Sequence, residues 1–126
     1  MTEQITFAAR LKELRLGKRL SQRELAERVA RRLKEQDRRG FDFTYLSKIE
    51  NGRMPPPSRP AIEALAAELG GDVDELLALG GKPPSDIEQE LQNPKARAFY
   101  RSAINANLSG DEWDELIKKL KRMTKE

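Results

Sequence analysis

Residues 41–52 decide the fold of this chain, and they read Phe-Asp-Phe-Thr-Tyr-Leu-Ser-Lys-Ile-Glu-Asn-Gly. Asp42 is a good helix N-cap, because its carboxylate can accept a hydrogen bond from an unpaired N–H of the first turn. Asn51 and Gly52 end the helix, because both residues tolerate the left-handed conformation of a C-cap. The stretch therefore predicts a short helix over residues 43–50.

This short helix has two different faces. At about 100° per residue, Phe41, Leu46 and Ile49 point to one side, and Phe41 and Leu46 are spaced for a hydrophobic staple. The opposite side carries mostly small or hydrogen-bonding side chains, with one aromatic ring at the margin: Thr44, Ser47, Lys48 and Phe43. Slender side chains with a few donors and methyl-contacting groups suit a helix that enters a DNA groove.

Two motifs in the chain resemble the Cro/CI–XRE family of helix-turn-helix regulators: Ser21-Gln22-Arg23-Glu24-Leu25-Ala26 and, later, Thr44-Tyr45-Leu46-Ser47-Lys48-Ile49-Glu50-Asn51-Gly52. The resemblance covers residues 7–79. It implies an all-α fold with a five-helix, lambda-repressor-like DNA-binding domain. It also implies that Arg15 pairs with Glu50 and ties the first helix to the recognition helix. From the sequence alone, an exposed Arg15 remains the alternative.

The resemblance also implies which residues contact DNA. Family members read base edges at the positions that match Phe43, Thr44, Ser47 and Lys48. The DNA backbone is assigned to two groups, Gln22 with Arg23 at the head of the second helix, and Tyr45, Asn51 and Arg53 around the recognition helix. A helix N-terminus of this kind favours a bound phosphate. Phe43 replaces the polar residue that is more usual at its position, so the operator sequence cannot be predicted.

The spacing between the two motifs departs from the family. Leu25 and Tyr45 lie 20 positions apart, whereas a helix-turn-helix joins its helices through a turn of about 3–4 residues. The helical period of apolar residues persists to Leu33, so we expect the second helix to extend to Gln36, followed by a loop over residues 37–40. Two arginines nearest the recognition helix, Arg38 and Arg39, are further candidates for phosphate contacts. For the other basic residues of this extension a solvated helix face is the alternative.

The distribution of charge points to a polyanionic partner. The 126 residues carry a net charge of only +3, but residues 1–60 hold 15 Lys and Arg against 8 Asp and Glu, a net of +7. Residues 61–126 hold 9 against 13, a net of −4. A basic first half predicts double-stranded DNA as its partner, although a solvated charged surface would give the same count.

The chain contains no cysteine and no histidine. These absences exclude disulfides, thiolate or imidazole metal ligands and histidine-based acid–base chemistry. Ser47 and Lys48 are adjacent on a helix, which is no nucleophile–base geometry, and phosphate-loop spacing is lacking. We therefore expect no enzyme, no catalytic residue, no metal and no cofactor. No apolar run approaches the length of a membrane span, so we expect a soluble, cytoplasmic protein without a membrane partner.

The remaining capping signals predict five more helices, over residues 59–69, 73–79, 85–91, 94–106 and 109–125. Gly80-Gly81-Lys82-Pro83-Pro84 has the composition of a linker. We therefore divide the chain into a DNA-binding domain (residues 1–79), a linker (80–84) and a helical dimerisation segment (85–126).

The last two helices carry apolar side chains at helical spacing: Phe99, Tyr100, Ile104, Trp113, Leu116, Ile117 and Leu120. A hairpin of about 40 residues cannot bury enough surface to be stable alone. It must pack on the front domain or on another copy of the chain, and the linker favours a homodimer.

The ending also resembles repressors related to DdrO and ImmR. That resemblance implies dimer-holding C-terminal helices and a partner zinc protease that inactivates the repressor. The sequence thus predicts a sequence-specific regulator, a repressor that binds an inverted-repeat operator as a dimer. The alternative is an antitoxin-type module whose C-terminal helices bind a toxin.

Overall fold

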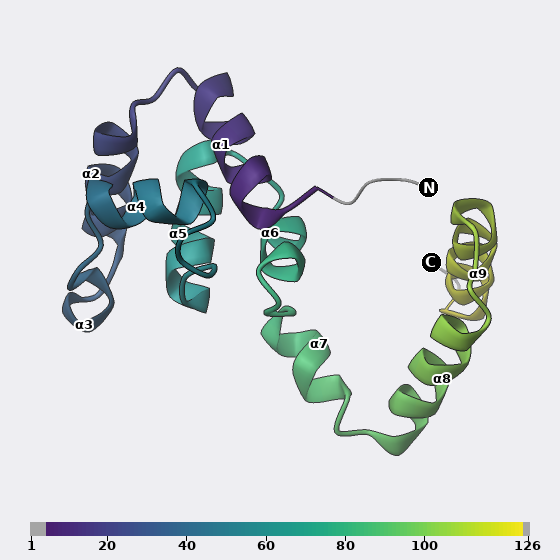
Figure 1. Cartoon of the computed structure of the whole chain (residues 1–126). Coiled ribbons are helices and arrows are strands. Elements are labelled where there is room, and N and C mark those ends of the chain that lie inside the picture. The colour runs from purple at the N-terminus through teal and green to yellow at the C-terminus, as the bar shows by residue number, and fades with distance from the viewer. Residues whose placement is uncertain (1–4, 125–126) are drawn as a thin grey trace. The chain divides into compact units, whose positions relative to one another are not determined.

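The computed structural model describes residues 5–124, and within them every regular element is a helix (Figure 1). The chain divides into two compact units, Met1–Pro84 and Ser85–Glu126. The front unit contains α1 (Phe7–Gly17), α2 (Gln22–Arg32), α3 (Glu35–Arg38), α4 (Phe43–Glu50), α5 (Arg59–Leu69) and α6 (Val73–Leu79). The back unit contains α7 (Ser85–Glu90), α8 (Pro94–Asn105) and α9 (Gly110–Thr124). The predicted all-α fold is confirmed.

Capping residues set the ends of the helices in the front unit. Asp42 accepts a hydrogen bond from the Tyr45 N–H and starts α4, as predicted. Ser21 and Glu24 form a capping box at the start of α2. Gly70 ends α5 with a left-handed φ of 64°, a conformation that glycine adopts without steric cost. The predicted bounds of α4, α5 and α6 are confirmed.

The core of the front unit is aliphatic, and it fixes the orientation of α4. Its largest fully buried side chains are Leu11, Val29, Leu25, Leu46, Ile49, Ile62, Leu65 and Leu76. α4 packs against α1 and α2, and α2 packs in turn against α5. The predicted inner face of α4 is confirmed, because Phe41, Leu46 and Ile49 are all buried. The opposite face of α4 is therefore held outward.

The second helix is shorter than predicted. α2 ends at Arg32, Leu33 is extended (φ −88°, ψ 148°), and residues 35–38 form the separate turn α3. The prediction that this helix reaches Gln36 was wrong, because Leu33 is buried and gives the same apolar period whether or not the backbone stays helical. As a result, ten residues (33–42) separate α2 from α4 instead of a short turn.

The predicted linker groups with the front unit. Residues 80–84 lie within Met1–Pro84, and the Arg59 Nη1–H donates a hydrogen bond of 2.7 Å to the carbonyl oxygen of Pro83. Pro83 is thereby tied to the start of α5.

The back unit leaves much of its apolar surface uncovered. Ala103 is its one buried hydrophobic side chain among the described residues. Its exposed large hydrophobic side chains are Ile87, Phe99, Tyr100, Ile104, Trp113, Ile117, Leu120 and Met123. α9 follows a turn in which Asn107 has a left-handed φ of 51°. All seven residues predicted for dimerisation lie on α8 or α9, and only Leu116 is partly buried.

Candidate nucleic-acid interface

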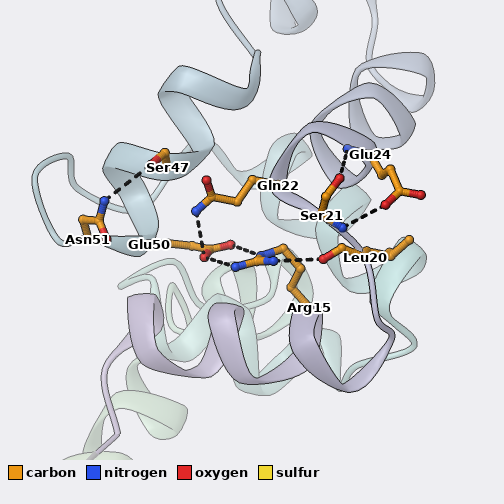
Figure 2. A network of polar contacts seen from close by, with 8 residues as sticks. All are labelled: Arg15, Leu20, Ser21, Gln22, Glu24, Ser47, Glu50 and Asn51. Atoms are coloured by element: carbon orange, nitrogen blue, oxygen red, sulfur yellow. Dashed lines mark hydrogen bonds and ion pairs between the residues drawn. The ribbon is translucent and has the colours of Figure 1, made fainter.

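A buried ion pair ties α4 to α1 (Figure 2). The Arg15 Nε–H donates to Glu50 Oε2 (2.6 Å) and its Nη2–H donates to Glu50 Oε1 (2.8 Å). The Arg15 Nη1–H donates to the carbonyl oxygen of Leu20 (2.9 Å), just before α2. The hydrogen bond to Glu50 raises the pKa of Arg15, so the guanidinium stays charged. The family resemblance implies the pair between Arg15 and Glu50. The bond to Leu20, which it does not imply, connects the same side chain to the entrance to α2.

Gln22 joins the same network. Its Nε2–H donates to Glu50 Oε1 at 3.1 Å, so its amide is fixed against α4 (Figure 2). The second amide N–H of Gln22 remains able to donate a hydrogen bond to a phosphate group. The structure therefore gives Gln22 a positioning role that the sequence did not indicate, alongside its predicted contact with the DNA backbone.

The outer face of α4 carries the predicted base-reading residues. Thr44 and Lys48 are exposed, Phe43 is 38% exposed, and Ser47 is half-buried. Ser47 Oγ accepts a weak hydrogen bond from Asn51 Nδ2 (3.4 Å), so these two side chains also interact with each other. Thr44, Ser47 and Lys48 project from a helix whose other face is fixed in the core.

Arg23 lies against Phe43. Its guanidinium carbon is 4.1 Å from the centre of the Phe43 ring, the geometry of a cation–π contact. The two residues come from the first turns of α2 and α4. Both residues are predicted from the sequence to lie near DNA, but the contact between them is not, because no local sequence pattern relates positions 20 residues apart.

Arg38 has a structural role in this arrangement. Its Nε–H donates to the carbonyl oxygen of Ala30 (2.8 Å), and its Nη2–H donates to the carbonyl oxygen of Leu33 (3.0 Å). These carbonyls belong to the last turn and C-cap of α2, where a helix end leaves carbonyl oxygens short of intrahelical donors. The Ala30 oxygen also accepts the Leu33 N–H, so Arg38 is its second donor. Arg38 and Arg39 are both exposed. Because the guanidinium of Arg38 already donates to two carbonyl oxygens, Arg39 is the stronger candidate for a phosphate contact.

The other residues that are predicted to contact the DNA backbone lie on α4 or just after it. Tyr45 is half-buried, with its ring edge-on to Phe41 at 5.5 Å, and burial raises the pKa of its hydroxyl. The Tyr45 hydroxyl therefore stays protonated and able to donate a hydrogen bond. Asn51 and Arg53 are exposed, and the Arg53 backbone N–H donates to the carbonyl oxygen of Lys48.

Arg19 is a basic residue that the sequence analysis did not single out. It is exposed, has a left-handed φ of 56°, and lies two residues before the N-cap of α2. Its position beside the N-terminus of α2 makes it a further candidate for a phosphate contact. Its only sequence signal is its nearness to the Ser21 capping box.

Residues 5–124 contain neither a cluster of metal-ligating side chains nor a membrane-spanning helix. No group of three or more histidine, cysteine, aspartate or glutamate side chains in this part of the chain could hold a metal ion. None of the helices described is both long and apolar enough to cross a membrane.

The comparison with protein families agrees with the placement of the motifs. Residues 6–79, more than half of the chain, match the model of a family described as "Helix-turn-helix domain". A solved structure entitled "SinR protein/SinI protein complex" is similar to this chain, with 25% sequence identity and a TM-score of 0.47. That comparison covers 96% of this chain and 100% of the other. No curated protein matches the chain.

Proposed function

This chain belongs to the helix-turn-helix domain family, and from that premise we propose that it is a sequence-specific DNA-binding transcriptional regulator. In this arrangement α4 is the recognition helix, which enters the major groove. The N-terminus of α2 lies against the phosphate backbone, where unpaired N–H groups and the helix dipole favour an anion.

The observation that carries the proposal is the contrast between the two faces of α4. Its inner face is fixed by buried Leu46 and Ile49 and by the Arg15–Glu50 ion pair. Its outer face exposes Thr44 and Lys48, which can contact a thymine methyl group and donate to guanine O6 or N7. A rigid helix whose outer face exposes hydrogen-bonding side chains suits the reading of base edges.

Charge supports the same partner. The net charge of +7 over residues 1–60 favours a polyanion. Each phosphate that Lys or Arg neutralises releases a counterion, so the affinity should fall steeply as the salt concentration rises.

The proposal extends to a repressor that acts as a homodimer on an inverted repeat. The back unit exposes Phe99, Tyr100, Ile104, Ile117 and Leu120, more apolar surface than an isolated soluble hairpin normally leaves in water. A second copy of the same hairpin would cover this surface. It would also place two recognition helices on two half-sites related by a two-fold axis.

Selection of bound DNA from a random pool, followed by binding at several salt concentrations, tests the proposal. We expect an enriched inverted repeat and a linear fall of log affinity with log salt. A non-specific duplex of equal length is the control, and it should bind more weakly at every salt concentration. The absence of any affinity at low salt, for every selected DNA, would end the proposal.

A further inference from the structure

The contact between Arg23 and Phe43 sits where α2 and α4 begin. Arg23 occupies the second position of α2 and Phe43 the first position of α4. Both side chains are exposed, and the guanidinium carbon lies 4.1 Å from the ring centre. An exposed aromatic ring on the base-reading face of the helix is thus covered on one side by a cation.

No carboxylate in the described part of the chain forms an ion pair with Arg23. Glu27 and Asp42 are nearby, since both help to line the same hollow as Arg23, yet the guanidinium lies on the ring instead. At 4.1 Å from the ring centre, the guanidinium is close enough to restrict the ring and to be restricted by it. The contact therefore orients both groups at once.

Among the described residues the Phe43 ring has a cation–π contact with Arg23 and no contact with another aromatic ring. Beside Arg23 and Phe43 lies a hollow of about 190 Å³, which the small side chains of Ala26 and Ala30 help to leave open. A phenyl ring gains free energy by leaving water, so an unrestrained Phe43 would turn toward this hollow. The stacked guanidinium is the contact that opposes such a turn.

We propose that Arg23 is a specificity-determining residue that positions the Phe43 ring to contact the 5-methyl group of a thymine in each half-site. This inference rests on the proposed function, because it concerns which bases the recognition helix reads. Arg23, which the sequence assigns to the DNA backbone, would then act on base recognition by positioning the Phe43 ring. It also follows that a 5-methylcytosine, which presents the same methyl group in the major groove, substitutes for the thymine at this contact.

Replacing thymine by uracil removes the methyl group and changes nothing else on the base edge, so it isolates the contact. Within the selected DNA site, each thymine is replaced in turn by uracil and the dissociation constant is measured. We expect one thymine in each half-site at which uracil weakens binding by about fourfold. This fold-change corresponds to the free energy gained when one methyl-sized group leaves water. Phe43→Ala should abolish this uracil effect.

The role of Arg23 is tested with two replacements in the full chain. Arg23→Ala should reduce the uracil effect to less than twofold although Phe43 is present. Arg23→Lys should do the same while keeping the positive charge, because an ammonium group lacks the plane that stacks on the ring. Arg31→Ala removes the same charge from an exposed position on α2, and it should keep the full uracil effect.

The results show whether Arg23 positions the Phe43 ring or only contacts the DNA backbone. If Arg23→Ala and Arg23→Lys keep the fourfold uracil effect, Arg23 does not position the ring and the inference is wrong. If no thymine of the selected site responds to uracil, Phe43 does not read a methyl group and the inference also fails, while binding to the selected site would still support the proposed function. Circular dichroism of each variant establishes that the helices remain folded.

Discussion

Glu50 connects three segments of the front unit through one carboxylate. It accepts hydrogen bonds from two nitrogens of Arg15 and from Gln22, and its side chain has no exposed surface. A buried ion pair of this kind adds little net stability compared with apolar side chains of the same volume. Removing one partner is costly, because the other charge is left buried. The pair therefore fixes the position of α4 more than it strengthens the fold.

Arg15→Ala should lower the free energy of unfolding by about 3–5 kcal/mol, because the Glu50 carboxylate would lose its charged partner. Urea unfolding followed by circular dichroism measures this change. Arg10→Ala is the matched control, since Arg10 lies on the same helix and pairs with Glu13 and Glu75 at the surface; its effect should be much smaller. The double variant Arg15→Met/Glu50→Leu should recover most of the loss. Equal effects of Arg10→Ala and Arg15→Ala would contradict the argument.

Substitution of a residue that contacts bases should change DNA binding differently from substitution of a residue that contacts DNA phosphates. Lys48→Ala and Thr44→Ala should each relax the preference at one position of the operator, with about 1–3 kcal/mol of discrimination lost. Gln22→Ala should weaken binding to all sequences alike, because phosphate contacts position the protein without reading sequence. Selection of DNA with each variant measures both effects. A selected motif that is unchanged for Lys48→Ala and Thr44→Ala would mean that the recognition face has been misplaced.

At the scale of single helices, capping boxes link stability to pH. The backbone N–H and hydroxyl of Ser21 lower the pKa of Glu24. Because the folded-state pKa is depressed, this contribution to stability is complete above the ordinary value of 4.5 and is lost as the pH falls through the folded value. Glu112 has the same relation to Ser109 at the start of α9.

Glu24→Gln tests this linkage, because glutamine keeps the shape of the capping box but does not titrate. The variant should be less stable than the parent at pH 7, and the difference should shrink toward zero as the pH falls below 4.5 and through the lowered folded-state pKa of Glu24. Thermal unfolding at several pH values measures the difference. A difference that is independent of pH would show that the charge of Glu24 contributes nothing.

Which elements could be predicted depends on where their determining contacts lie. The ends of α4, α5 and α6 follow from residues within one turn of each end, such as Asp42, Ser58 and Asp72. The end of α2 does not, because residues 33–39 contain neither glycine nor proline. It is fixed instead by the burial of Leu33 and by the Arg38 side chain, which bonds to carbonyl oxygens five and eight residues earlier.

In the candidate site, too, features set by neighbouring residues could be predicted, and features set by distant residues could not. The exposure of Thr44 and Lys48 is a consequence of helical periodicity, so it could be predicted from the sequence. The bond from Gln22 to Glu50 and the stacking of Arg23 on Phe43 join residues 28 and 20 positions apart. Such contacts depend on how α2 and α4 pack, which no local pattern contains.

At the scale of the whole molecule, the two units differ in how completely they bury their apolar residues. Among the residues that the structure describes, the front unit has 18 buried hydrophobic residues in its core cluster and the back unit has only Ala103. The front unit is therefore expected to fold on its own, and the back unit is expected to need a partner surface. A change in the back unit is therefore expected to affect dimer formation without lowering the stability of the front unit.

The last prediction concerns a truncated protein that ends at Asn107. It lacks α9 and with it Trp113, Ile117 and Leu120, which lie exposed along that helix. We expect it to be monomeric, to keep a folded front unit, and to bind an inverted repeat roughly 10²–10⁴-fold more weakly, because the second half-site is no longer tethered to the first. Light scattering, circular dichroism and binding to the full site measure these properties.

In the full chain, the double variant Ile117→Asp/Leu120→Asp should have the same effect as the truncation. Lys118→Ala, which changes an exposed residue outside the apolar set, should have no effect. If the truncated protein still dimerises and binds the full site normally, the interface lies in the front unit and the C-terminal helices serve a different partner.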